Sequence, residues 1–531
     1  MTEEVEQERP TLKGEAALRL WRRGRYAWNS WIDQHPGWDI AFSYINFSSE
    51  RDVEGNLSFS GYHFGVGDIN FSLANFGEGN VDFSGADFGN GNVDFSGTTF
   101  GKGEVTFSGA AFGNGNVNFS YVNFGEGGVN FSNTTFGKGY VDFSKATFSE
   151  GNLDFSGAAF DDGNVDFSEA TFGKGDVDFS MAIFGNGDVN FQGITFGSSN
   201  VLFVGTHFGD GIVTFSWSNF GSSNVVFTWA TFGKCKLFFS EVTVGNGEVK
   251  FDMTSFGNST IAFDKANLEK LTFSPTKIET SYIEAEGLSI KGRAIFSFAT
   301  NAALLKSFNL HSASFDGPLT ITGDISTIPD LRATRYSHQV DLSELNVKLP
   351  RVWQGFGWPP KLSRVAKAPQ DGARLRRLKE IAETNKDHQA ALRFSADENR
   401  ARRWIETSWL GSVLDMAFSA FSDYGQSILR PFVCLFAIFI GWAGFYKSIA
   451  ASTLTAWWEG CGWAQAFILS ASNSLPFLPQ SRDLRAAALE TLYGTATNPG
   501  SWVNALMISQ GVLSFVFLFL IGLGLRNRFR L

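Results

Sequence analysis

Residues 93–104 read Val-Asp-Phe-Ser-Gly-Thr-Thr-Phe-Gly-Lys-Gly-Glu, and residues 105–116 repeat the pattern as Val-Thr-Phe-Ser-Gly-Ala-Ala-Phe-Gly-Asn-Gly-Asn. One series of phenylalanines occupies every twelfth position from Phe59 to Phe263, and a second series runs from Phe64 to Phe232. A fixed short period predicts a solenoid, because one unit is too small to bury its own apolar face.

The spacing within each unit predicts short β-strands. Apolar residues lie two positions apart, as in Val93 and Phe95, which places both on one face of a strand. Pieces such as Gly89-Asn90-Gly91 interrupt the strands and offer the backbone freedom that a corner needs. We therefore predict a β-helix in which phenylalanine stacks on phenylalanine from coil to coil.

Steps between successive phenylalanines alternate between five and seven residues. The five-residue pieces, such as the one containing Ala86-Asp87-Phe88, resemble the pentapeptide-repeat family, whereas the seven-residue pieces depart from its pattern by two residues. The resemblance implies a right-handed quadrilateral β-helix with two twelve-residue units in each coil. A flattened coil of one unit is the alternative. We favour four sides, because two facing phenylalanine stacks leave a smaller coil little room for Val and Ala.

The 531-residue length allows several domains, and composition separates five segments. We expect a helical cap over 1–40, a β-helix over 41–348 (regular over 57–268, degenerate over 269–348), a Pro/Trp linker over 349–370, a basic helical pair with a juxtamembrane segment over 371–425, and a transmembrane hairpin over 426–531. The cap is predicted as one amphipathic helix with a glycine flaw at Gly24. The net charge is −10, yet the segment after Arg351 is basic.

Two apolar runs, residues 432–446 and 503–525, approach or exceed the ~20 residues that cross a bilayer. Arginines precede the first run and follow the second, so the positive-inside rule places both termini in the cytoplasm. The sequence thus predicts a multi-pass protein of the inner (cell) membrane, with the lipid bilayer as a partner. The predicted lipid-headgroup contacts are Arg400, Arg402, Arg403, Arg430, Arg526, Arg528 and Arg530. The alternative for the arginines of the helical pair is a solvated helical surface.

Residues 462–479, between the two runs, are too short and too polar to span, and we interpret them as a re-entrant or interfacial segment. The order of span, half-helix, loop and span resembles the two-span pore module of tetrameric cation channels. The Thr-Val-Gly-Tyr-Gly filter is missing, so potassium selectivity is not implied. The predicted pore-lining residues are Ser470, Ser472, Asn473, Ser474, Ser509, Gln510 and Ser514. The alternative is an extracellular cap whose Ser and Gln side chains join helices.

Together with the lead-in Ala27-Trp28-Asn29-Ser30-Trp31 and the arginine-rich tail, these features resemble bacterial pentapeptide-repeat membrane proteins that end in a two-span, channel-like hairpin. The resemblance implies architecture and says little about activity.

Enzymatic chemistry is not expected. The six histidines are isolated, and none pairs with Cys or a carboxylate at a metal-ligand spacing. No base recurs beside the repeat serines either, so we predict no catalytic residue, no metal and no cofactor. Outward aspartates predict acidic ladders: Asp82, Asp94, Asp142, Asp154, Asp166 and Asp178. Some pentapeptide-repeat proteins imitate duplex DNA and inhibit gyrase. Here Asn118 and Asn130 dilute the ladder, so we favour solubility and expect no nucleic-acid partner.

Two functions remain open. The first is a homo-oligomer whose cytoplasmic β-helix acts as a sensor or assembly domain and whose hairpin conducts ions or permeabilises the membrane. The second is a non-conducting, membrane-tethered scaffold that binds an unknown protein partner. The outward apolar residues proposed for that partner surface are Leu202, Trp217, Val226, Trp229 and Phe238.

Overall fold

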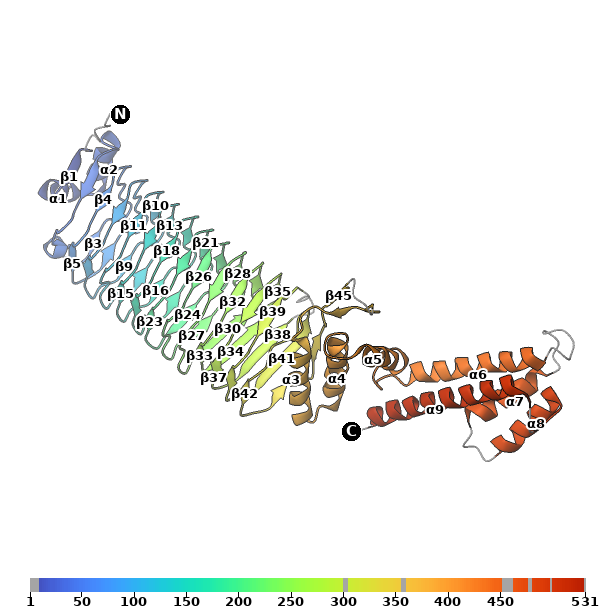
Figure 1. Ribbon diagram of the computed structural model, residues 1–531. Coiled ribbons are helices and arrows are strands. Elements are labelled where there is room, and N and C mark those ends of the chain that lie inside the picture. The colour runs from blue at the N-terminus through green and yellow to red at the C-terminus, as the bar shows by residue number, and fades with distance from the viewer. Residues whose placement is uncertain are drawn as a thin grey trace. The chain divides into compact units, whose positions relative to one another are not determined.

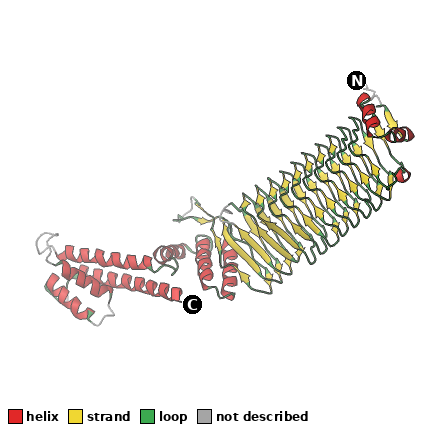
Figure 2. Ribbon diagram, turned by 180° about the vertical axis from the view of Figure 1, so that it is seen from behind, coloured by secondary structure: helices red, strands yellow, loops and turns green. Residues whose placement is uncertain are grey.

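A computed structural model describes residues 9–298, 304–354, 360–450, 462–475, 480–496 and 499–529. It divides into two compact units, Met1–Pro350 and Arg351–Leu531. The first unit is a β-solenoid of about 14 coils and the second is mainly helical, as Figures 1 and 2 show. The predicted fold class is confirmed.

One coil of the solenoid contains four strands. They are β7 (Val93–Asp94), β8 (Thr99–Phe100), β9 (Val105–Thr106) and β10 (Ala111–Phe112). The next strand, β11 (Val117–Asn118), pairs in parallel with β7, with Val117 opposite Val93. A coil is therefore 24 residues long and holds two sequence units, which confirms the four-sided coil that we favoured over the flattened one.

The stacked strands form four faces, which we number in chain order. Face 1 has 13 strands, from β1 (Thr11–Lys13) to β39 (Ser307–Asn309). Face 3, on the opposite side of the coil, has 14, from β3 (Leu57–Ser58) to β43 (Val340–Asp341) and β44 (Leu345–Val347). Face 4 has eight strands, β10 to β35 (Lys277–Ile278). Face 2 carries short sheets linked by isolated bridges, such as that between Thr99 and Asn123.

The core consists of columns of stacked phenylalanine rings. Phe95 lies between Phe71 and Phe119, with ring centroids 4.7 and 5.0 Å away and nearly parallel planes. Phe107, from the opposite face, meets Phe95 edge to face at 5.6 Å. These rings are fully buried. Stacking within columns and edge contacts between them are the favourable aromatic geometries, so the predicted inward phenylalanines are confirmed.

Glycine is required at the Gly-x-Gly corners for a second reason besides the backbone freedom inferred from the sequence. A Cβ on Gly91 would lie 2.0 Å from the carbonyl oxygen of Gly67, one coil earlier, and Gly115 repeats the relation with Gly91. Close approach of successive coils excludes any side chain there. Backbone freedom is the reason only at some corner positions, such as Gly97 with φ +62°.

The N-terminal cap differs from the single helix that we predicted. It consists of α1 (Glu15–Trp21) and α2 (Arg25–Gln34), separated by Gly24 with φ 86°. Trp28 is fully buried and its Nε1 donates to the His63 carbonyl over 2.8 Å. The preceding strand β1 pairs with β2 (Asp39–Ala41) and extends face 1, an element the sequence did not suggest.

Toward its C-terminal end the solenoid has coils of variable length. Val249 pairs with Leu271, 22 residues on, whereas Ile295 pairs with Thr320, 25 residues on. Strands lengthen as well, as in β41 (Leu319–Ile325). Changing coil length explains why the twelve-residue phenylalanine rhythm disappears although the strands continue.

The second unit begins with an antiparallel pair, β45 (Arg351–Val352) and β46 (Val365–Ala366). Two packed helices follow, α3 (Asp371–Thr384) and α4 (His388–Arg402). Asp387 accepts a hydrogen bond from Ala390 N over 3.0 Å, which confirms it as the N-cap of α4. The remaining helices are α5 (Trp409–Ser422), α6 (Leu429–Ala450), α7 (Trp463–Ser474), α8 (Ser481–Tyr493) and α9 (Ser501–Phe529).

Candidate functional site: the polar cluster of the C-terminal helices

Helices α6 and α9 are long and apolar enough to cross a membrane by length and composition. They run side by side in opposite directions (Figure 1), because Gly425 contacts Asn527 near one end and Tyr446 contacts Gln510 nearer the other. Only about a fifth of the apolar stretch of each helix is buried within the unit. The rest presents apolar side chains outward, as a lipid-facing helix does.

The short helix α7 packs against α6, α8 and α9. The segment predicted as re-entrant, residues 462–479, contains α7 over Trp463–Ser474. Residues 476–479 of that segment lie outside the described part of the chain. A small apolar core that includes Tyr446, Leu469, Leu492 and Val503 holds the four helices together. Helix α8 is an element that the sequence interpretation did not include.

Gln510 stands at the centre of a buried polar cluster. Its Nε2 donates to Ser470 Oγ over 2.7 Å, to the Ser470 carbonyl over 3.1 Å and to Ser474 Oγ over 3.0 Å. Its Oε1 accepts from Tyr446 OH over 2.8 Å and from Asn473 Nδ2 over 3.3 Å. All five residues are buried. The Gln510 side chain on α9 therefore supplies hydrogen-bond partners to buried polar groups on α6 and α7.

Further hydrogen bonds tie the same helices together. Asn473 Nδ2 donates to the Met507 carbonyl over 2.8 Å, and Ser470 Oγ donates to the Phe439 carbonyl over 2.7 Å. Polar contacts between helices in lipid hold a bundle together where the hydrophobic effect cannot. The cluster can therefore fix the position of α7 between α6 and α9.

The seven predicted pore-lining residues do not lie together. Ser470, Asn473, Ser474 and Gln510 share the cluster, whereas the hydroxyls of Ser472 and Ser509 donate to carbonyls of their own helices. Ser514 is buried, and its hydroxyl has no hydrogen-bond partner among the described residues. Pore lining by these side chains stays a prediction. Tyr446 is the cluster member that the sequence interpretation missed, because a single Tyr in an apolar run is an ordinary interfacial residue.

The predicted headgroup arginines divide into two groups. Arg403 is buried and donates to Asp415 over 2.7 Å, while Arg400 and Arg402 form ion pairs with neighbouring carboxylates. Arg430, Arg526 and Arg528 are exposed, although Arg430 also pairs with Asp423 over 3.5 Å, and Arg530 lies outside the described residues. The exposed arginines flank the end of the helix pair where α6 begins and α9 ends.

The apolar residues predicted as one partner surface lie on two opposite sides of the solenoid. Leu202 and Val226 are neighbours on face 3, and Trp229 follows at its corner. Phe238 lies on face 1, and Trp217 follows a strand of that face. Trp217 and Trp229 remain mostly exposed. The five residues are therefore two separate surfaces, whose binding role stays a prediction.

The acidic ladders are also divided between the faces. Asp82, Asp154 and Asp178 lie on face 3, and Asp94, Asp142 and Asp166 lie on face 1. Each accepts a hydrogen bond from the backbone N–H two residues on, over 2.7 to 2.9 Å. This side-chain turn is a structural use of Asp or Asn two residues before Ser, a signal that is present in many of the repeats but is replaced in later ones, for example by Leu202 and Val226.

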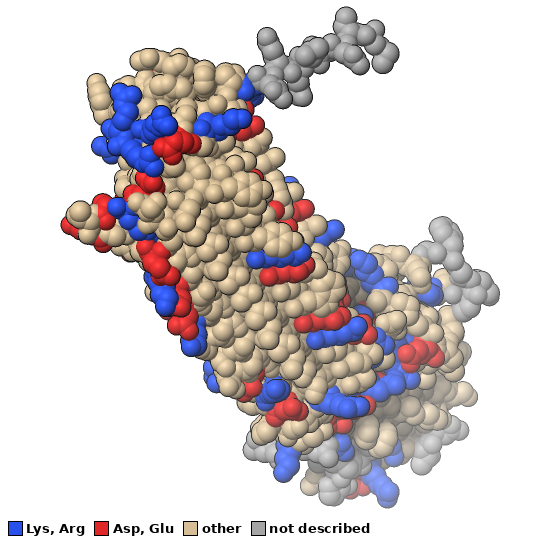
Figure 3. Space-filling view, turned by 90° about the vertical axis from the view of Figure 1, so that its left-hand side faces the viewer, with Lys and Arg blue, Asp and Glu red and all other residues tan. Residues whose placement is uncertain are grey.

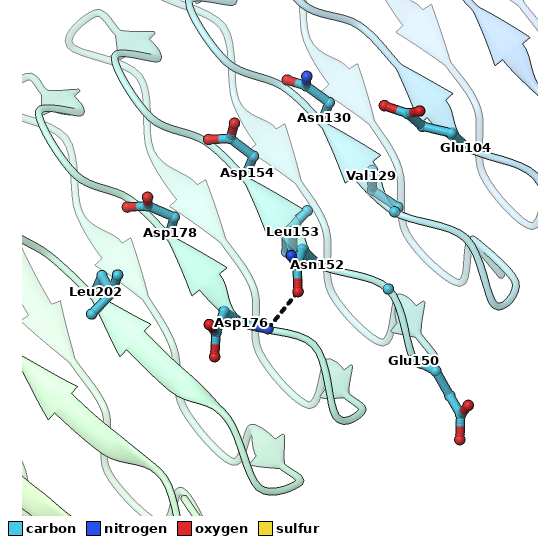
Figure 4. A pocket seen from close by; sticks show the side chains of 12 residues that line it. Glu104, Val129, Asn130, Glu150, Asn152, Leu153, Asp154, Asp176, Asp178 and Leu202 are labelled. Atoms are coloured by element: carbon cyan, nitrogen blue, oxygen red, sulfur yellow. Dashed lines mark hydrogen bonds between the residues drawn. The ribbon is translucent and has the colours of Figure 1, made fainter.

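A shallow pocket of about 710 Å³ lies along face 3 (Figure 4). Carboxylates of Glu104, Glu150, Asp154, Asp176 and Asp178 line it together with Leu202. Figure 3 shows that charged side chains elsewhere on the solenoid stand in rows separated by uncharged surface. Cross-coil pairs such as Lys102 with Glu126, 3.6 Å apart, account for such rows.

No protein-family model, curated protein or solved structure gives a significant match to this chain. The fold and the candidate site therefore define the class by themselves. The protein is a β-solenoid repeat protein followed by helices, two of which are candidate membrane spans.

Proposed function

We propose that the protein is a membrane-anchored repeat scaffold of the inner (cell) membrane. Helices α6 and α9 hold the chain in the bilayer, both termini lie in the cytoplasm, and the solenoid offers its outward faces to a protein partner. The observation that carries the proposal is the outward apolar surface of the two helices. Phe432, Phe436 and Ile440 on α6 and Phe515 and Phe519 on α9 are each about half exposed or more.

The polar cluster favours an anchor over a pore. A pore wall needs polar groups that face water, and Ser470, Asn473 and Gln510 instead bond to one another and to backbone inside a single chain. Breaking these bonds to expose the groups would cost roughly 0.5–1.5 kcal/mol for each bond. The cluster thus supports a rigid, closed bundle.

A conducting homo-oligomer is the second candidate, with the solenoid as its sensor or assembly domain. The observation that favours it is α7, a 12-residue helix between two spans whose last two turns carry Ser470, Asn473 and Ser474. Planar-bilayer recording on the purified full chain separates the candidates. The scaffold predicts no conductance above the bare bilayer, and reproducible unitary currents would replace it with the channel.

Membrane topology tests the scaffold itself. In a chain with Cys235, Cys434 and Cys461 replaced by alanine, a single cysteine replaces either Lys174 on the solenoid or Leu484 on α8, and both positions are exposed. In intact cells a membrane-impermeant maleimide should label Leu484→Cys and should reach Lys174→Cys only after permeabilisation. Labelling of Lys174→Cys in intact cells would overturn the cytoplasmic assignment of the solenoid.

A further inference from the structure

Helix α5 buries polar residues and exposes apolar ones, the reverse of a helix on the surface of a soluble protein. Its buried residues are Ser412 and Ser422, both with no exposed surface. Its strongly exposed residues include Leu410 at 62%, Leu414 at 63% and Phe421 at 42%. A helix on a soluble protein turns its apolar stripe to the core and its polar side to water.

The two sides are opposite stripes of one helix. At roughly 100° per residue, Leu410, Leu414 and Phe421 fall within about 40° of one another. Ser412, Asp415 and Ser422 fall on the other side of the helix. The inversion is therefore a property of the whole length of α5, not of one side chain.

The polar side of α5 is fixed against the protein. Asp415 Oδ2 accepts from Arg403 Nε over 2.7 Å and from Tyr424 OH over 3.0 Å, and Arg403 Nη2 donates to the same Tyr424 oxygen over 2.9 Å. Ser412 Oγ accepts from the Trp404 N–H over 3.1 Å. Because Arg403 is only 5% exposed, rolling α5 to bury its leucines would strand a buried cation.

The exposed stripe continues into the candidate spans. Phe421 meets Phe517 of α9 edge to face at 5.4 Å, and α5 also packs against α6. Leu429 and Phe432, which open α6, are exposed as well. At 1.5 Å per residue, the 22 residues of α6 measure about 33 Å, close to the ~30 Å of a hydrocarbon core. If α6 spans the bilayer, the preceding helix lies at the level of the headgroups.

Charge at this end matches a lipid surface. Asn527 Nδ2 donates to the Gly425 carbonyl over 3.1 Å, which brings the arginine-bearing last turn of α9 beside the turn between α5 and α6. Exposed Arg526 and Arg528 thus join Arg430, which is half-exposed although it also pairs with Asp423 over 3.5 Å. Cations beside anionic headgroups contribute about 1 kcal/mol each.

We propose that α5 is an in-plane membrane helix that lies in the cytoplasmic interface. It inserts Leu410, Leu414 and Phe421 among the acyl chains while its serines and Asp415 face α4. Amphipathic helices bind the interface in this way, with the apolar side buried ~5–10 Å below the headgroups. The inference rests on the proposed function, because it places α5 relative to spans α6 and α9. It extends the anchor from two spans to two spans and a membrane-parallel helix.

Spin labels measure this placement directly. In the full-length chain with Cys235, Cys434 and Cys461 replaced by alanine, single cysteines at Leu410, Leu414, Phe515 and Lys174 would carry nitroxides in nanodiscs containing anionic lipid. Collision with oxygen reports lipid, and collision with a water-soluble nickel chelate reports water. We expect oxygen to dominate at least threefold at Leu410→Cys, Leu414→Cys and Phe515→Cys, and the nickel chelate to dominate at Lys174→Cys.

Other results distinguish a failure of the in-plane helix from a failure of the membrane anchor. A label in lipid at Phe515→Cys with a water-exposed label at Leu414→Cys overturns the in-plane helix and leaves the anchor standing. A Leu414→Cys label shielded from both reagents means that protein, such as a second copy, covers the stripe, which also overturns the inference. A water-exposed label at Phe515→Cys overturns the membrane anchor together with the inference.

Discussion

The side-chain amide of Gln510 donates to the Ser470 hydroxyl over 2.7 Å, which joins the long helix α9 to the short helix α7 across 40 residues of sequence. Gln510 also accepts from Tyr446 of α6, so three helices meet at one side chain. This relation makes the cluster a structural joint of the C-terminal bundle.

Gln510→Leu should destabilise that bundle by about 1–3 kcal/mol, because it leaves the buried hydroxyls of Tyr446, Ser470 and Ser474 short of a partner. Ser509→Ala is the matched control on the same helix, since the one hydrogen bond of the Ser509 hydroxyl among the described residues goes to the Leu506 carbonyl of its own helix. Unfolding of the full chain in mixed micelles with increasing dodecyl sulfate measures both variants. Equal midpoints for the two variants would show that the cluster contributes nothing to the bundle.

Phe143→Ala should cost about 3–5 kcal/mol of solenoid stability, the usual cost of removing a buried phenylalanine. Phe143 stacks between Phe119 and Phe167 at 4.9 and 4.8 Å. Lys145→Ala, two residues away at an exposed corner, should change the urea midpoint little. A loss of unfolding free energy below about 1 kcal/mol in Phe143→Ala would contradict the claim that the stacked phenylalanines form the stabilising core.

Two adjacent glycines distinguish close approach from flexibility. A Cβ on Gly127 would lie 2.0 Å from the Gly103 carbonyl oxygen, whereas a Cβ on Gly128 meets nothing closer than 3.6 Å. Gly127→Ala should therefore destabilise by about 1–3 kcal/mol, as overpacking does, and Gly128→Ala should be close to neutral. Thermal unfolding followed by circular dichroism compares the two. Similar melting temperatures for the two variants would show that close approach of the coils is not the reason for glycine at position 127.

Cys235 should resist alkylation in the folded protein. Burial raises the pKa of its thiol from an ordinary 9.0 to about 11, so the reactive thiolate is scarce at pH 8.5. Since the folded-state pKa is the higher one, the thiol's contribution to stability is complete below pH 9 and is lost as pH rises through about 11. Mass spectrometry after iodoacetamide treatment should find Cys235 unmodified and an exposed Lys234→Cys modified. Equal rates at the two positions would mean that the solenoid opens there.

The repeat was predictable because each coil repeats the same physical problem. At a period of two, residues such as Val93 and Phe95 share one face of a strand, and that face must turn inward. The 24-residue register needed a further argument, the room that Val and Ala require inside the coil, because a 12-residue register would also pair like residues. The cap was less predictable. Gly24 lies inside an apolar pattern that suits one helix, and only packing of Trp28 against Phe42 and the solenoid end selects two.

The candidate site was predictable in its residue types but not in their partners. Ser470, Asn473 and Gln510 stand out as polar residues in apolar surroundings, which fits a pore wall or a contact between helices. The choice depends on how α7 turns relative to α9, and that rotation is set by tertiary packing around Tyr446. The inversion of α5 was hidden for the same reason, because its amphipathic pattern is the same whichever side faces protein.

Alkaline carbonate extraction of membranes from cells that make the full chain tests the membrane anchor most directly. High pH strips peripheral proteins and leaves proteins held by spanning helices in the pellet. We expect the protein to stay in the pellet at pH 11, with or without 1 M salt. Release of the full chain into the supernatant would contradict α6 and α9 as membrane spans, and with them the scaffold and the in-plane helix.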